Sequence, residues 1–179
     1  MKKLLMILPL AMILCFMVGC QDKEAMAELE AMKAQAEVEE QNKDLVRRWV
    51  EEEDKGNFDI YEELLAPDYV CYYPGSPEPL NREAHKQSAI LFFKSFPDTI
   101  HTIENMIAEN DLVAFHTTLK GTHKGEFMGI TPTDNEINVG AVWICRIKEG
   151  KIIEVRGVGD LLGMMMQLGM ELKPKEAEK

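Results

Sequence analysis

The sequence predicts an α+β domain in which helices come first and long antiparallel strands follow. Two patterns predict this fold class. Apolar residues recur at helical spacing over residues 89–96, whereas over residues 137–147 they occupy every second position, which is the period of a strand. Because the helical and the strand-like segments are grouped and not interleaved, their order excludes alternating βαβ units.

Three helices are expected in the first half of the domain. Asn42 is a suitable N-cap for the first of them. A short second helix is expected over residues 59–65, since Pro67 disfavours helical backbone in the residue before it. Asn81 is expected to cap a third helix, which carries the apolar stripe.

Five segments are expected as strands. Residues 69–73 are rich in aromatic and β-branched side chains and stop at a Pro-Gly-Ser-Pro cluster. The others, separated by turn signals, are residues 99–109, 112–121, 137–147 and 151–158. A short helix from Asp160 closes the domain. Together these elements predict a curved antiparallel sheet with helices on one face.

The N-terminus is expected to carry a targeting signal. Lys2 and Lys3 precede an uncharged apolar run over residues 4–18, which is shorter than the roughly 20 residues of a membrane span. Residues 1–19 are therefore expected to be a cleaved signal peptide. The sequence Met-Val-Gly-Cys at residues 17–20 resembles a bacterial lipoprotein cleavage box. The resemblance implies that Cys20 is lipidated, with an ordinary signal peptide or an uncleaved anchor as the alternatives.

The address that follows from this resemblance is the bacterial cell envelope. In that class of lipoproteins the residue after the lipidated cysteine influences sorting, and Gln21 favours the periplasmic side of the outer membrane in a Gram-negative bacterium. Residues 20–41 consist of strong helix formers on an acidic background and are expected to form a helical tether. A short coiled coil or partner helix is the alternative. Residues 171–179 form a charged tail.

The composition excludes several kinds of partner. With 31 acidic and 20 basic side chains among 179 residues, the formal net charge is -11, and no nucleic-acid partner is expected. The four cysteines lack C-x-x-C spacing and H-E-x-x-H is missing, so no metal is expected. The spacing of Gly157, Gly159 and Gly163 does not fit a dinucleotide loop, and no organic cofactor is expected. Cys71 and Cys145 are expected as buried free thiols, with a disulfide as the alternative.

Six segments in order resemble one known family. They read NKDLVRRW from residue 42, LLAPDYV from 64, FPD from 96, LKGTHKGEFMGI from 119, RIKEGKIIE from 146 and GVGDLLG from 157. This series is similar to the SnoaL-like polyketide cyclase or ester cyclase family over residues 42–169. The resemblance implies a domain over residues 42–170 with the cone-shaped, cystatin-like α+β barrel of the nuclear-transport-factor-two superfamily. It also implies a deep apolar pocket and a homodimer.

The resemblance further implies an acid–base residue. Asp160 stands where the cyclases place the acidic residue that serves an intramolecular aldol closure. Burial in an apolar site would raise the pKa of such a carboxyl toward working pH. The alternative role of Asp160 is that of a helix cap, and both roles can hold together. His123 lies in a segment that resembles the family's loop at the pocket mouth, where it is expected either to shuttle protons or to be solvated.

Large side chains are expected to line the pocket. The candidates are Trp49, Tyr72, Phe127, Trp143 and Met165, with ordinary core positions as the alternative. Arg146 is expected to meet a ligand anion or to pair with a carboxylate. Of the remaining histidines, His116 is expected to face solvent or a dimer partner, and His85 and His101 to lie at the surface.

Two functions follow as hypotheses. The first is cofactor-free acid–base chemistry, an aldol cyclisation or isomerisation, on a small carbonyl compound held in the pocket of an envelope-anchored protein. The second is a non-catalytic lipoprotein that binds a small apolar molecule or a protein partner. Pairs such as Cys71-Tyr72, where the family often has Asp-His, keep the second hypothesis open.

Overall fold

In the computed structural model, the described backbone covers residues 7–173 and the described side chains begin at residue 23. The start of the expected signal peptide, the side chain of Cys20 and the end of the charged tail lie outside these residues. The chain forms two compact units, Met1–Val38 and Glu39–Lys179. In the part of the chain that is described, no helix is long and apolar enough to cross a membrane.

Helix α1 (Ile7–Asp54) is continuous, so Asn42 does not begin a new helix as expected. The reason is local, because residues 21–41 contain only residues that tolerate helix and no glycine or proline to end it. Asn42 instead lies within the helix, buried, and its amide donates to the carbonyl of Asn110 over 3.2 Å. The helix ends before Gly56, whose φ of +73° is a left-handed conformation.

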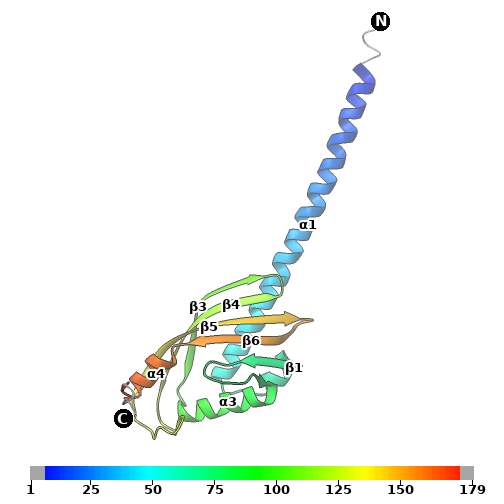
Figure 1. Ribbon diagram of the computed structural model, residues 1–179. Coiled ribbons are helices and arrows are strands. Elements are labelled where there is room, and N and C mark those ends of the chain that lie inside the picture. The colour runs from blue at the N-terminus through cyan, green and yellow to red at the C-terminus, as the bar shows by residue number, and fades with distance from the viewer. Residues whose placement is uncertain (1–6, 174–179) are drawn as a thin grey trace, which may run out of the picture. The chain divides into compact units, whose positions relative to one another are not determined.

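The second unit has the predicted α+β architecture. Its six strands form one curved sheet that does not close, in the order β2-β1-β6-β5-β4-β3, and Figure 1 shows the long strands curving beside α3. The strands are β1 (Leu65–Tyr72), β2 (Leu80–Asn81), β3 (Ile100–Glu109), β4 (Leu112–Thr122), β5 (Glu136–Lys148) and β6 (Lys151–Gly159). The helices besides α1 are α2 (Ile60–Leu64), α3 (Arg82–Ser95) and α4 (Leu161–Gln167).

The pairing of the first strand differs from the expected all-antiparallel sheet. Strand β1 runs parallel to β6, with Val70 opposite Glu154 and Cys71 opposite Val155. The remaining neighbours are antiparallel. The two-residue strand β2 was not expected, because two residues are too few to show a strand period.

The N-cap of helix α3 is as predicted. The side chain of Asn81 accepts a hydrogen bond from the backbone N–H of Ala84 over 2.9 Å, and α3 begins directly after Asn81.

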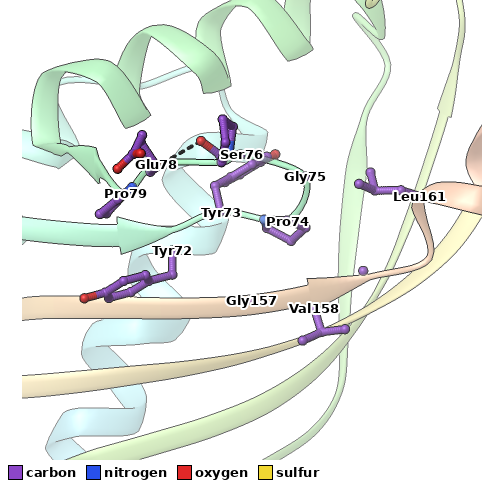
Figure 2. Close-up of a pocket in the computed structure, with 12 residues that line it drawn as sticks. Tyr72, Tyr73, Pro74, Gly75, Ser76, Glu78, Pro79, Gly157, Val158 and Leu161 are labelled. Atoms are coloured by element: carbon purple, nitrogen blue, oxygen red, sulfur yellow. Dashed lines mark hydrogen bonds between the residues drawn. The ribbon is translucent and has the colours of Figure 1, made fainter.

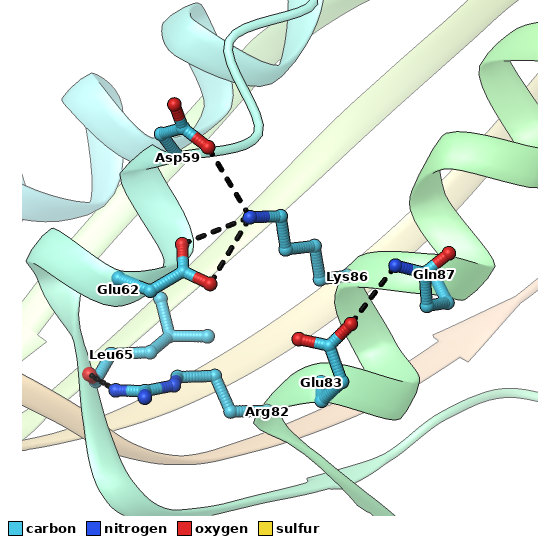
Figure 3. Close-up of polar contacts among 7 residues, drawn as sticks. All are labelled: Asp59, Glu62, Leu65, Arg82, Glu83, Lys86 and Gln87. Carbon is cyan, nitrogen blue, oxygen red and sulfur yellow. Dashed lines mark hydrogen bonds and ion pairs between the residues drawn. The ribbon is translucent and has the colours of Figure 1, made fainter.

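Polar contacts join helix α3 to α2 and to Leu65 at the start of β1 (Figure 3). The ammonium of Lys86 donates to Glu62 and Asp59, and Arg82 donates to the carbonyl of Leu65.

The core lies on the concave face of the sheet, in two clusters. The larger one packs Val46, Trp49 and Val50 of α1 against inward side chains of β4, β5 and β6, Cys145 included. The smaller cluster lies toward the N-terminal end of β5 and contains Phe96, Ile137, Met164 and Leu168. Of the described cysteines, Cys71 and Cys145 are free and buried, and burial raises the pKa of both thiols.

Candidate functional site

An apolar cavity of about 300 Å³ opens between the concave face of the sheet, α3 and α4. We call it the outer cavity. Its walls include Phe92 of α3, Leu119 of β4, Trp143 of β5 and Met164 of α4, together with Phe127. This volume lies at the lower end of the range of small-molecule sites, and aromatic walls suit a flat apolar ligand.

A second space of about 90 Å³, which we call the inner cavity, adjoins the outer one. Both are lined by Tyr73, Phe92, His101, Thr117, Leu119 and Trp143. Beyond these shared residues the inner cavity is lined by Trp49 and Phe115, and also by Glu53, Tyr61 and His85. The inner cavity is therefore lined by more titratable side chains than the outer one.

Asp160 lies on the wall of the outer cavity and caps helix α4. Its Oδ1 accepts a hydrogen bond from the backbone N–H of Gly163 over 2.8 Å. The residue as a whole is exposed, so its carboxylate is at the solvent end of the cavity. Asp160 thus caps the helix and lies beside an apolar space, but it is not buried there as expected.

His101 was expected at the surface, and this expectation is wrong. The residue lies on the concave side of β3 and lines both cavities. Its Nδ1 is 2.7 Å from Oδ1 of Asp54, in the last turn of α1. The second carboxylate oxygen, Oδ2, accepts a hydrogen bond from the backbone N–H of His101 over 2.9 Å. An ionised carboxylate can only accept, so the pair places the Nδ1 proton between them.

His85 is buried, which corrects its expected surface position. Its ring stacks on Tyr69 and its Nδ1 is hydrogen-bonded to the Tyr69 hydroxyl over 2.9 Å. Burial lowers the pKa of His85 to about 4, so the imidazole is neutral at pH 7. Glu53 lies nearby and accepts a hydrogen bond from the Tyr61 hydroxyl. Burial raises the pKa of the Glu53 carboxyl, while the bond from Tyr61 acts in the opposite direction.

Two expected pocket residues, Tyr72 and Arg146, point away from the cavities. Tyr72 lies on β1 beside β6 (Figure 2), at a shallow surface hollow that Val158 also lines farther along β6. The Arg156 guanidinium is 3.8 Å from the centre of the Tyr72 ring. Arg146 pairs instead with Asp111 over 2.6 Å. Strand alternation is the reason, since the residues next to both of them are buried on the inner face.

His123 and Met165 also differ from their expected placement. His123 is fully buried and packs against Phe96, with ring centroids 5.1 Å apart, so it belongs to the core and not to a pocket mouth. The backbone N–H of Thr133 donates to its Nδ1 over 3.3 Å. Its Nε2 has no hydrogen-bond partner among the residues that the structure describes. Met165 is half-buried, and its neighbour Met164 takes the cavity position one helical step away.

The structure therefore brings together Trp49, Phe127, Trp143 and Asp160 of the expected site. Sequence reasoning missed Glu53, His85 and His101. A signal for His85 existed, because it precedes the apolar stripe of α3 by one turn and so shares its face. Within the described residues, no three His, Cys, Asp or Glu side chains gather in a way that could hold a metal ion.

Comparison with known proteins agrees with this architecture. The family model of the SnoaL-like polyketide cyclases matches residues 43–168. The chain belongs to the SnoaL-like polyketide cyclase family. Two similar relatives within this group are the aklanonic acid methyl ester cyclases DauD of Streptomyces sp. strain C5 and DnrD of Streptomyces peucetius. Each is 31% identical over 131 residues, which cover 70% of this chain and 80% and 89% of the relatives.

Solved structures of SnoaL-like proteins share the fold. IdmH of Streptomyces antibioticus has a TM-score of 0.66 and 29% identity, over 72% of this chain and 99% of IdmH. A SnoaL-like protein of Jannaschia sp. CCS1 has a TM-score of 0.69 and 25% identity, over 75% of this chain and 95% of that protein. The SnoaL-like fold predicted from the residues, with its nuclear-transport-factor-two-like architecture, is confirmed.

Proposed function

We propose that this SnoaL-like protein performs acid–base chemistry on a small carbonyl compound held in the outer cavity. The observation that carries the proposal is a carboxylate, that of Asp160, on the wall of an apolar space of about 300 Å³. Asp160 takes a proton from the carbon beside a carbonyl group. The resulting enolate carbon bonds to a second carbonyl carbon of the same molecule, and the new alkoxide takes up a proton.

Aklanonic acid methyl ester is the first compound to test, because two relatives that are 31% identical are named as its cyclases. An intramolecular aldol closure moves no atoms out of the molecule. The product is therefore expected to elute differently in chromatography with unchanged mass.

Asp160→Asn is expected to lower turnover by about 10²-fold or more, because the amide cannot take a proton. Its thermal midpoint is expected to stay close to that of the wild type, because asparagine caps a helix as well as aspartate does. The measurement is turnover of the ester by both proteins, with melting recorded on the same samples. Full turnover with an unchanged midpoint would show that Asp160 is only a cap.

A binding function is the second candidate, and the hydrogen bond that ties Asp160 to the start of α4 favours it. A carboxylate engaged in a cap and open to solvent is less suited to remove a carbon-bound proton than a buried one. Native mass spectrometry of protein purified from its host would then detect a bound apolar molecule. The wild type and Asp160→Asn are expected to carry it equally if the protein only binds.

We also propose attachment to the envelope membrane through a lipid on Cys20, supported by the lipoprotein-like sequence at residues 17–20. Cys20→Ala is expected to abolish membrane association, because the lipid anchor is lost. Export is expected to continue, because the apolar run over residues 4–18 that directs it remains. Fractionation of cells into membrane and soluble parts measures this. Unchanged membrane association of Cys20→Ala would contradict the proposal.

A homodimer through the convex face of the sheet is the proposed assembly. Apolar side chains are exposed there and adjacent in register: Val158 is opposite Val142, and Ile144 and Ile107 flank Ala114. Val142→Glu is expected to shift the protein from dimer to monomer in light scattering coupled to size exclusion, because it buries a charge in the interface. A wild-type monomer would refute the proposed assembly directly.

A further inference from the structure

His101 lies in the wall of both cavities, and its partner Asp54 lies behind it, at an open groove on the surface. His101 lines the outer and the inner cavity at the place where they join. Both oxygens of Asp54 are engaged by His101, one by Nδ1 over 2.7 Å and the other by the backbone N–H over 2.9 Å. The backbone N–H holds the carboxylate in place, and the carboxylate in turn sets the direction of Nδ1.

This arrangement leaves the other ring nitrogen for chemistry. With the proton on Nδ1 directed at Asp54, Nε2 of a neutral imidazole carries a lone pair. Nε2 is on the ring edge opposite to Asp54, and the side chain as a whole borders the two cavities. When Nε2 takes a proton, the adjacent carboxylate of Asp54 compensates the new positive charge.

We propose that His101 is the catalytic base and acid of the joined cavities, and that Asp54 is the residue that positions it. The inference rests on the proposed function only in that it places acid–base chemistry in this cavity, and it does not require Asp160. The substrate class is a flat, largely apolar molecule with an acidic C–H bond beside an electron-withdrawing group. Nε2 takes the carbon-bound proton, the electron pair moves into the acceptor group, and the imidazolium later returns a proton to the product.

The surroundings of the pair expose its carboxylate to solvent. On the side away from the cavities, Asp54 and His101 line an open groove with Arg47, Glu51 and Glu104. Solvent therefore reaches Asp54, on the Nδ1 side of the ring, without entering the cavities. The charged and titratable groups that face His101 are Asp54, these three groove residues and, from within the inner cavity, Glu53, Tyr61, Tyr73 and His85.

The test uses 5-nitrobenzisoxazole as a probe of a base in an apolar cavity. Removal of its C3 proton forms a nitrile and breaks the N–O bond, which releases a coloured phenolate. Full-length protein in detergent is compared with detergent alone. We expect a rate above the blank, and a loss of about 10²-fold in His101→Gln. Asp54→Asn is expected to lower kcat for the probe while its KM stays close to that of the wild type, because the ring is no longer held with Nδ1 toward a carboxylate.

The control is His116→Gln, a matched substitution on the convex side of β4 outside the cavity, which is expected to leave the rate unchanged. Binding of the product phenolate, followed by fluorescence, shows that each variant retains a folded cavity. A variant that binds the phenolate but has lost the rate supports the proposal. A wild-type rate equal to the blank, or an unchanged rate in His101→Gln, overturns it.

The probe also separates this inference from the role of Asp160. If Asp160→Asn loses the rate and His101→Gln keeps it, the assignment of His101 fails and the proposed function stands. If His101→Gln loses the rate and Asp160→Asn keeps it, the inference stands and Asp160 is only a cap. If both variants keep the wild-type rate, neither residue is the base.

Discussion

Gly157→Val is expected to destabilise the protein by about 1–3 kcal/mol and to close the passage between the two cavities. Gly157 on β6 is paired with Trp143 on β5. A Cβ added at Gly157 would lie 2.9 Å from Cη2 of the Trp143 ring and closer still to two other ring carbons. The indole must therefore move into the space that it now lines.

Denaturant unfolding measures the loss of stability, and binding of the nitrophenolate product measures the loss of the cavity. Gly159→Ala is the comparison for stability, because it is on the same strand and the same face. Its added Cβ would be 3.6 Å from Ala141, an ordinary contact, and a small effect is expected. If Gly157→Val bound the phenolate as the wild type does, the indole would not define the passage.

Phe96→Ala is expected to cost about 3–5 kcal/mol of unfolding free energy, because a whole aromatic ring is lost from the core. Phe96 is completely buried, and its ring contacts Phe92, Phe127 and His123 at centroid distances of 4.8, 5.3 and 5.1 Å. Its removal leaves a void beside residues that line the outer cavity. Denaturant unfolding at fixed protein concentration measures the change.

Leu91→Ala in the neighbouring helix α3 is the comparison for this truncation. Leu91 is 61% exposed, and its substitution is expected to change stability by no more than about 0.5 kcal/mol. A loss below about 1 kcal/mol in Phe96→Ala would mean that the smaller core cluster rearranges to fill the space.

The long strands and the caps could be predicted because their signals are local. The alternation over residues 137–147 predicted which face of β5 is buried, and the same alternation would have placed Arg146 outside the cavity. Tyr72 follows the same rule beside the buried Cys71. These two residues were assigned by side-chain type when the strand period already decided their direction.

The Asp54–His101 pair could not be predicted in this way. The two residues are 47 positions apart and meet only because the end of α1 packs against β3. Neither forms part of a motif, and each alone is an ordinary polar residue at the end of an element. The parallel pairing of β1 with β6 is also a consequence of tertiary structure, since no local pattern distinguishes it from an antiparallel one.

The junction of the two cavities imposes an orientation on whatever enters them. The outer space is about three times larger than the inner one, and both share the side chains of Tyr73 and Trp143. A molecule that occupies both must be tapered, with its slender end directed inward, and it cannot be turned end for end. The protein can thus distinguish the two ends of a substrate by size alone. Which carbon of the substrate reacts would then be decided on entry, before any bond changes.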